Sequence, residues 1–151
     1  MNEHSALDQR FGLGPIDQIS FAVRDLDDAV PRYTAMFGGP FTIMDVPDLA
    51  VVIGGEPCLT SLRLGFGRTG RRDDIEVELV EVVSGDWPTL GWLAEHGEGL
   101  HHVRYPVIDL AASRDEMVAA GFEVLLEGSG GYFAYLTSPL LNGMVVELIS
   151  L

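Results

Sequence analysis

The sequence predicts an α+β fold in which two tandem β-α-β-β-β modules form one curved mixed sheet. The first observation behind this prediction is a near-repeat, because residues 17–26 align with residues 101–110 at a constant offset of 84. The second is that a helical pattern and then short strand patterns follow each copy. The third is that each copy closes on a strand that carries a carboxylate, at 77–80 and 145–149. A repeated supersecondary unit strongly constrains the fold.

The first module begins with a strand at residues 16–24, in which side chains alternate between two faces. Asp25 or Asp27 can cap the helix that follows, because a carboxylate accepts hydrogen bonds from the free amides of the first turn. The helix is expected to run to Phe37, and residues 38–40, Gly-Gly-Pro, end it. Short strands separated by Gly, Pro and Asp complete the module at 41–44, 50–53, 58–64 and 75–82.

The second module begins with a strand at residues 100–107, which leads to a helix near residues 110–120. Gly121 ends this helix, since glycine favours the left-handed conformation found after a helix C-terminus. Residues 84–98 connect the two modules and contain one short helix at about residues 90–95. The remaining strands of the second module are expected at 123–126, 132–137 and 144–150.

The two modules are expected to form one domain over residues 14–151. Module one covers about residues 14–83 and module two covers residues 99–151, while residues 1–13 form a polar tail. A chain of 151 residues with 47% hydrophobic residues is long enough to bury a core. Its one cysteine, Cys58, rules out a disulfide within the chain and fits a reducing compartment. No signal-peptide pattern and no apolar run of about 18 residues is present, so a cytoplasmic protein is expected.

The charge of the chain bounds its partners. Nine Lys and Arg residues stand against 23 Asp and Glu residues, which gives a formal net charge of −14. Nucleic-acid backbones and anionic membrane surfaces attract cationic proteins, so neither partner is expected. A small-molecule substrate is the expected partner.

The repeat singles out four polar residues as a candidate metal site. The offset of 84 places Gln18 on His102, and the closing strands contribute Glu78 and Glu147. A carboxylate inside an apolar strand is costly to bury without a partner, and a cation is the simplest partner. The alternatives are that Glu78 faces solvent and that His102 is a hydrogen-bonded structural residue. His101 is expected to face away from His102, so only one of the two histidines can enter the site.

Two carboxylates, one imidazole and one amide oxygen suit a divalent metal ion such as Zn, Ni, Co, Mn or Fe. Such an ion can act as a Lewis acid on two adjacent substrate oxygens and stabilise an enediolate. Glu147 or Glu78 would then serve as the general base that moves the proton.

The chain resembles the vicinal oxygen chelate superfamily, which includes glyoxalase I, methylmalonyl-CoA epimerase, extradiol dioxygenases and bleomycin-resistance proteins. The resemblance spans about residues 16–151 and rests on residues 16–26, 99–103 and 142–148. It implies paired modules around a metal cleft. It also implies the ligand set Gln18, Glu78, His102 and Glu147, which is similar to the metal site of one class of glyoxalase I. A homodimer is expected, with the cleft closed either within one chain or across two.

Three departures from the family patterns bear on the substrate. Extradiol dioxygenases use two histidines and a glutamate around iron, and Gln18 removes one of those histidines. Ala22 and Glu98 stand where glutathione-using glyoxalases carry arginines. Ser61 stands near the position of a second catalytic glutamate in the epimerases, which weakens the case for a two-base epimerisation.

Four residues are expected to contact the substrate. Arg104 lies two residues beyond His102 on the same face and can bind a carboxylate or an enolate oxygen, although a salt bridge to Glu76 or another acid is an equal alternative. Arg63 and Ser61 are expected to face the cleft together. Tyr132 follows a glycine pair, where an aromatic residue of the core or rim is the alternative reading.

The combined prediction is a metal-dependent isomerase, epimerase or lyase that acts on a small oxygen-chelating substrate through an enolate-type intermediate. One alternative is a non-catalytic binding or resistance protein that uses the same cleft to sequester a compound. A second alternative is an Fe(II) dioxygenase, which depends on iron being the bound metal.

Overall fold

The structure, a computed structural model, describes residues 11–69 and 75–151. Module one contains one helix and four strands, and module two repeats that order with an added 3-10 turn. The elements of module one are β1 (Gln18–Ala22), α2 (Leu26–Phe37), β2 (Thr42–Ile53), β3 (Glu56–Arg68) and β4 (Glu76–Ser84). The connector contains α3 (Pro88–His96). Module two contains β5 (Gly99–Val107), α4 (Leu110–Ala119), β6 (Glu123–Gly128), β7 (Phe133–Thr137), the 3-10 turn η1 (Pro139–Leu141) and β8 (Val145–Ser150).

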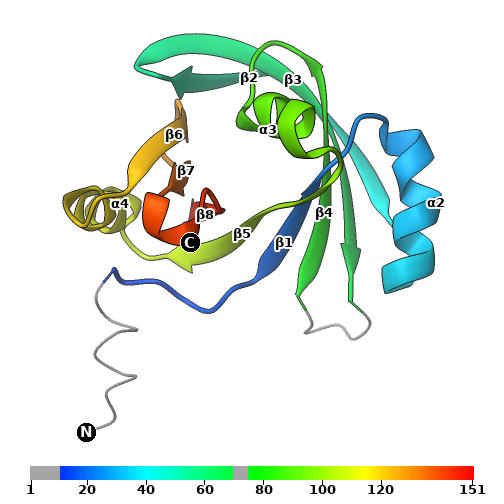
Figure 1. The fold of residues 1–151 in the computed structure, drawn as a ribbon, viewed down its shortest axis with the longest axis horizontal. Helices are drawn as coiled ribbons and strands as arrows, with labels where there is room; N and C mark the ends of the chain where they lie inside the picture. The colour runs from blue at the N-terminus through cyan, green and yellow to red at the C-terminus, as the bar shows by residue number, and fades with distance from the viewer. Residues whose placement is uncertain (1–10, 70–74) are drawn as a thin grey trace, which may run out of the picture.

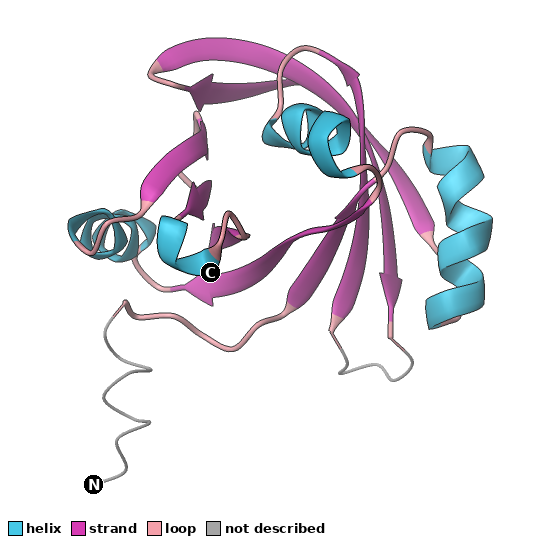
Figure 2. Ribbon diagram, viewed as in Figure 1, coloured by secondary structure: helices cyan, strands magenta, loops and turns pink. Residues whose placement is uncertain are grey.

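The strands form a closed barrel in the order β1-β4-β3-β2-β6-β7-β8-β5 (Figure 1). The pairs β1–β4 and β5–β8 are parallel, and the other neighbours are antiparallel. Helices α2 and α4 lie outside the ring of strands, one beside each module (Figure 2). The predicted mixed sheet of two β-α-β-β-β modules is therefore confirmed, and the sheet curves until it closes on itself.

Aspartate side chains cap both outer helices, and Asp25 is one of the two caps that the sequence predicts for α2. The Asp25 side chain accepts a hydrogen bond from the Asp28 amide at the start of α2, and Asp109 does the same for Ala112 at the start of α4. Each cap satisfies an amide that has no partner inside the helix. Helix α2 ends at Gly38, whose φ of 76° is accessible at little cost only to glycine.

Strand β2 differs from the prediction of two short strands. The segments at 41–44 and 50–53 are parts of one strand, which pairs with β3 on both sides of an irregularity between Val46 and Leu49. Asp48 takes the left-handed conformation there with φ of 51°, and its amide donates to the Ser61 hydroxyl at 3.0 Å. The turn-forming residues at this point therefore produce a bulge and not a chain reversal.

Strands β1 and β5 place the two repeats side by side. Ile19 pairs with Val103, its own equivalent at the offset of 84, so a local two-fold axis passes between them. Ser20 therefore pairs with His102, and Gln18 pairs with Arg104. The strands β4, β1, β5 and β8 are consecutive in the ring, so one chain supplies all four predicted ligand positions.

Three apolar clusters hold this architecture together. One fills the barrel, and the others lie beneath α2 and α4. Leu13 forms a bridge with Val107, and the rings of Phe11 and Phe122 are 6.1 Å apart, so the segment before β1 packs on module two. Within residues 11–69 and 75–151, no helix is long and apolar enough to cross a membrane.

Candidate metal centre

Three of the predicted ligands meet inside the barrel. Glu78 on β4, His102 on β5 and Glu147 on β8 each offer a ligand atom, and these atoms lie within 4.8 Å of one another. The Nε2 atom of His102 lies 3.1 Å from Oε2 of Glu147 and 3.9 Å from Oε1 of Glu78. All three side chains are buried, so they face one another with little access to water.

Gln18 on β1 has a free carbonyl oxygen that a cation can use. Its side chain is fully buried, and its Nε2 donates to Oε1 of Glu76 at 2.8 Å. That bond fixes the amide, yet the buried Oε1 atom has no hydrogen-bond partner. A buried polar atom without a partner is costly. Gln18 lies on β1, between the strands that carry Glu78 and His102, so an orphaned buried oxygen and three clustered ligand atoms together fit a divalent metal ion.

The electrostatics of the two carboxylates also favour a cation. Burial and then the charge of Glu147 raise the pKa of Glu78 to about 7, although His102 and the Ser20 hydrogen bond oppose this shift. The Ser20 hydroxyl donates to Oε1 of Glu78 at 2.7 Å. Two buried carboxylates do not ionise together readily without a positive charge between them. Sequence reasoning missed Ser20, although it lies on the same face of β1 as Gln18.

His101 lies against His102, contrary to the expectation that the two rings face apart. Ser20 pairs with His102 while the next residue, Phe21, pairs with Leu100, so His101 is the extra residue of a β-bulge. The bulge breaks the alternation of faces and brings the two Nδ1 atoms to 2.9 Å. Burial, aided by the neighbouring His102, lowers the pKa of His101 to about 3, so this ring is neutral.

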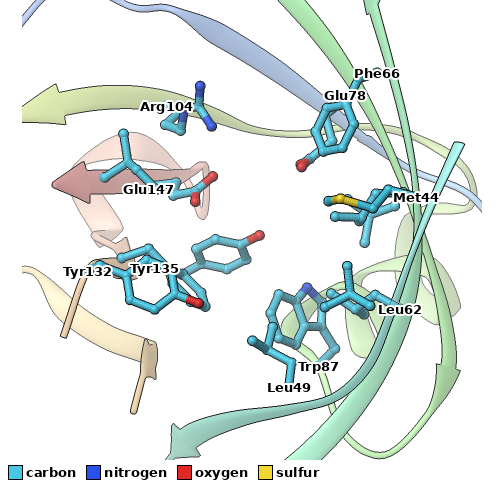
Figure 3. A pocket seen from close by; sticks show the side chains of 15 residues that line it. Met44, Leu49, Leu62, Phe66, Glu78, Trp87, Arg104, Tyr132, Tyr135 and Glu147 are labelled. Carbon is cyan, nitrogen blue, oxygen red and sulfur yellow. The ribbon is translucent and has the colours of Figure 1, made fainter. Parts of the chain in front are cut away.

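The carboxylates open onto a cavity of about 260 Å³ inside the barrel (Figure 3). One side of the cavity is polar and carries Glu78, Glu147, Arg104 and Tyr135. The wall formed by β2 and β3 is apolar, with the side chains Met44, Val46, Leu49, Leu62, Leu64 and Phe66.

Tyr135 and Trp87 are cavity residues that sequence reasoning did not select. Tyr135 pairs with Glu147 across β7 and β8, and its ring lies 4.6 Å from the His102 ring. Burial, and then the charges of Glu147 and Glu78, raise the pKa of Tyr135 well above its usual value, so its phenol keeps its proton. The Trp87 ring packs edge-on at 5.6 Å from the Tyr135 ring. Both are aromatic residues whose place in the cavity only the fold reveals.

Arg104 and Tyr132 line the cavity as the sequence predicts. The Arg104 guanidinium also forms two hydrogen bonds to Asp17, at 2.9 and 3.2 Å, and lies 3.9 Å from Glu76. The salt-bridge reading of Arg104 is therefore seen in the structure, with Asp17 as the nearest acid, while its contact with a substrate stays a prediction. Tyr132 is 47% exposed, which places it at the rim.

The structure does not bring Ser61 and Arg63 to the cavity. Leu62 and Leu64 of β3 line the cavity, and side chains alternate along a strand, so Arg63 between them faces outward. Ser61, which precedes Leu62, is not among the residues that line the cavity. The Ser61 hydroxyl bonds the Asp48 amide. The Arg63 guanidinium instead lies near three carboxylates, those of Asp27, Asp45 and Glu81.

The chain matches the family model of the glyoxalase/bleomycin resistance protein/dioxygenase superfamily over residues 17–135. This match covers more than half of the chain, so the protein belongs to that superfamily. The family resemblance seen in the repeat and in the closing strands is therefore confirmed.

Among curated proteins, an ethylmalonyl-CoA/methylmalonyl-CoA epimerase of Cereibacter sphaeroides is 27% identical over 144 residues, which covers 90% of this chain and 97% of that protein. Among solved structures, a methylmalonyl-CoA epimerase of Streptomyces coelicolor in complex with 2-nitronate-propionyl-CoA is similar, with a TM-score of 0.64 and 25% identity over 91% of this chain and 94% of that chain. A protein of Bacillus halodurans C-125 has a TM-score of 0.67 at 21% identity, covering 91% of this chain and 94% of that one. The similarity to the Bacillus halodurans protein supports the fold alone.

Proposed function

We propose that this protein is a metal-dependent isomerase of the epimerase type, which enolises a small acyl group that chelates a metal through two oxygens. The observation that carries the proposal is the buried group Glu78, His102 and Glu147, which opens onto an apolar cavity. The unpartnered carbonyl oxygen of Gln18 makes it the fourth proposed ligand.

Each polar residue of the cavity has a proposed role. A bound divalent ion would supply Lewis-acid stabilisation of the enolate oxygen. Glu78 or Glu147 removes the α-proton, since a carboxylate that lines the cavity can act as a general base toward a substrate bound there. The Tyr135 phenol, which stays protonated, can donate a hydrogen bond to a developing negative charge. The apolar wall of β2 and β3 limits the access of water.

The similarity to epimerases of coenzyme A thioesters supports a substrate of that class. A malonyl-type thioester has a thioester carbonyl and a carboxylate, which are the two oxygens that the proposed reaction needs. The cavity of about 260 Å³ accommodates an acyl group, while the larger carrier would extend past the rim at Tyr132. Arg104 is the cationic cavity residue that can pair with the substrate carboxylate.

The apolar wall limits the stereochemistry of the proposed reaction. Leu62 and Leu64, on the strand where the epimerase resemblance places a second base, present no proton-transferring group to the cavity. The proposal therefore assigns proton removal and proton return to the polar side of the cavity. Exchange of the α-proton is the essential prediction, and inversion at that carbon requires that Tyr135 or the second glutamate deliver the proton.

The test begins with metal analysis of protein purified without added metal. The α-proton signals of methylmalonyl-CoA and ethylmalonyl-CoA are then followed by NMR in deuterated buffer, with 2-oxo acids and hydroxyketones as further candidates. The expected result is stoichiometric divalent metal and an exchange that a chelator stops and added metal restores. Glu123→Gln, an exposed carboxylate at the start of β6, serves as the control and should exchange at the wild-type rate.

Each other outcome points to a different function. Binding of a compound without stoichiometric metal, unchanged by Glu78→Gln and Glu147→Gln, would overturn the enzyme proposal in favour of sequestration. Iron together with oxygen consumption would favour the dioxygenase alternative. The homodimer remains a proposal that sedimentation can test, and the ligand set does not require a second chain.

A further inference from the structure

The contact between His101 and His102 links the proposed metal site to a second cavity. His101 is the bulge residue of β5, and its side chain is only 3% exposed. The second cavity, of about 220 Å³, is lined by both histidines and by Trp92, His96, Leu100, Val103, Asn142, Gly143 and Met144. Among the described residues, the hydrogen-bond partner that the structure gives the His101 ring is the ring of His102.

This contact can hold a single hydrogen atom. The two Nδ1 atoms are 2.9 Å apart, so one of them must carry a hydrogen and the other must present its lone pair. When both rings are neutral, their tautomers are therefore linked. If His102 carries its hydrogen on Nδ1, then His101 must carry its own hydrogen on Nε2. If His101 carries its hydrogen on Nδ1, then His102 must carry its own on Nε2.

The other nitrogen of His102 decides which arrangement applies. Its Nε2 atom lies 3.1 Å from Oε2 of Glu147. Without metal, Nε2 can donate a hydrogen to Oε2 of Glu147, and Nδ1 then accepts a hydrogen bond from His101. With metal, Nε2 must present its lone pair, so Nδ1 carries the hydrogen and donates it to His101. Metal-bound histidines commonly use their second nitrogen in this way.

We propose that His101 is a positioning residue that holds His102 in the metal-binding tautomer and orientation, and that metal loading reverses the tautomers of both rings. This inference rests on the proposed metal site. The β-bulge is the structural basis of the inference. Regular alternation along β5 would instead place the two rings on opposite faces of the sheet.

The direct test is NMR of protein with ¹⁵N-labelled histidine, without metal and with Zn²⁺, using long-range correlations between imidazole carbon-bound hydrogens and ring nitrogens. Without metal, His102 should be protonated on Nε2 and His101 on Nδ1, and Zn²⁺ should reverse both assignments. The inference is overturned if His101 keeps one tautomer in both states while Zn²⁺ binds His102. A chain that binds no Zn²⁺ at His102 would instead refute the proposed metal site together with the inference.

Variants of His101 give a second readout in Zn²⁺ affinity, measured by competition with a chromogenic chelator. His101→Leu removes the acceptor and should weaken Zn²⁺ binding by about 10- to 100-fold. His101→Asn places an oxygen near the position of the lost Nδ1 atom and should recover most of that affinity. The matched control is His96→Leu, which changes another histidine of the second cavity and should leave the affinity unchanged. Equal losses in the Leu and Asn variants would indicate a packing role only and contradict the proposal.

Discussion

In module one, Glu78 receives a hydrogen bond from Ser20 on the neighbouring strand, whereas in module two the equivalent position beside Glu147 is occupied by Arg104. The Arg104 guanidinium turns to Asp17, and Glu147 is contacted by His102 instead. The first-strand ligands differ in the same way. Gln18 has Glu76 beside it, while His102 has the apolar Val145 beside it and takes its second partner from the bulge. The two modules share strand order and ligand positions but support the ligands with different side chains.

Of the two modules, the second is expected to bind the metal ion more strongly. An imidazole is a better ligand for zinc-like ions than an amide oxygen. Gln18 would contribute a weaker donor, and its side chain is held in place by Glu76.

The largest effects are expected from removing either carboxylate. Glu78→Gln and Glu147→Gln should each abolish stoichiometric metal and lower the rate of α-proton exchange by about 10³-fold, because each removes a ligand and a candidate base. Measurement of metal content and exchange rate checks both. If one variant keeps its metal but loses exchange, that glutamate is the base and the other is the ligand. Unchanged exchange in both variants would contradict the proposed chemistry.

The next effect separates the two first-strand ligands. His102→Leu should weaken Zn²⁺ binding by more than about 100-fold, since even the loss of a supporting partner costs about 10- to 100-fold. Gln18→Leu should lower the Zn²⁺ affinity by about 10-fold, and Gln18→His should raise it. Competition titrations measure all three variants, with Glu123→Gln as the control. Equal losses for the two Leu variants would show that the modules contribute equally.

A pH dependence of stability is expected from Glu78 in the metal-free protein. Its folded-state pKa of about 7 lies above the ordinary value of 4.5, so the folded state binds more protons than the unfolded state between these values. This contribution is fully present below pH 4.5 and is lost as the pH rises through about 7, for a total of about 3 kcal/mol. Denaturation between pH 5 and 8 should show this loss, and Glu78→Gln should flatten it. Stability that rises with pH in both proteins would contradict the assignment.

The smallest effects are expected at Arg63 and Ser61, on the outer face of β3. The carboxylates of Asp27 and Asp45 near Arg63 are largely exposed, and exposed ion pairs contribute little to stability. Arg63→Gln should lower the midpoint of thermal unfolding by no more than about 3 °C. Zn²⁺ affinity and KM should stay unchanged in Arg63→Gln and in Ser61→Ala. A tenfold rise in KM would return these residues to the substrate site.

Local sequence patterns were enough to predict the parts of the fold that depend on residues close together in the sequence. The cap at Asp25 and the repeat of strand order are examples, because capping and alternation act within a few residues. The repeat also selected Glu78, His102 and Glu147, which the structure brings together. These three residues lie on strands that a duplicated module must place side by side.

Features that depend on strand pairing could not be predicted in the same way. The face on which Ser61 and Arg63 lie changes with a shift of one residue in β3, and no local pattern fixes that parity. The approach of His101 to His102 depends on a bulge opposite Ser20, which is a property of two strands and not of one. Tyr135 becomes a site residue only because β7 pairs with β8 beside Glu147.

The ring of strands is joined unevenly. Strands β2 and β6 pair through two residue pairs, Val51 with Gly128 and Val52 with Glu127, and this seam lies on the opposite side of the barrel from β1 and β5. Local opening needs the least free energy where few backbone hydrogen bonds must break. Amide hydrogens at this seam should therefore exchange with solvent earlier than those of β1 and β5. Transient separation there would widen the barrel while the four strands that carry the candidate ligands stay in register.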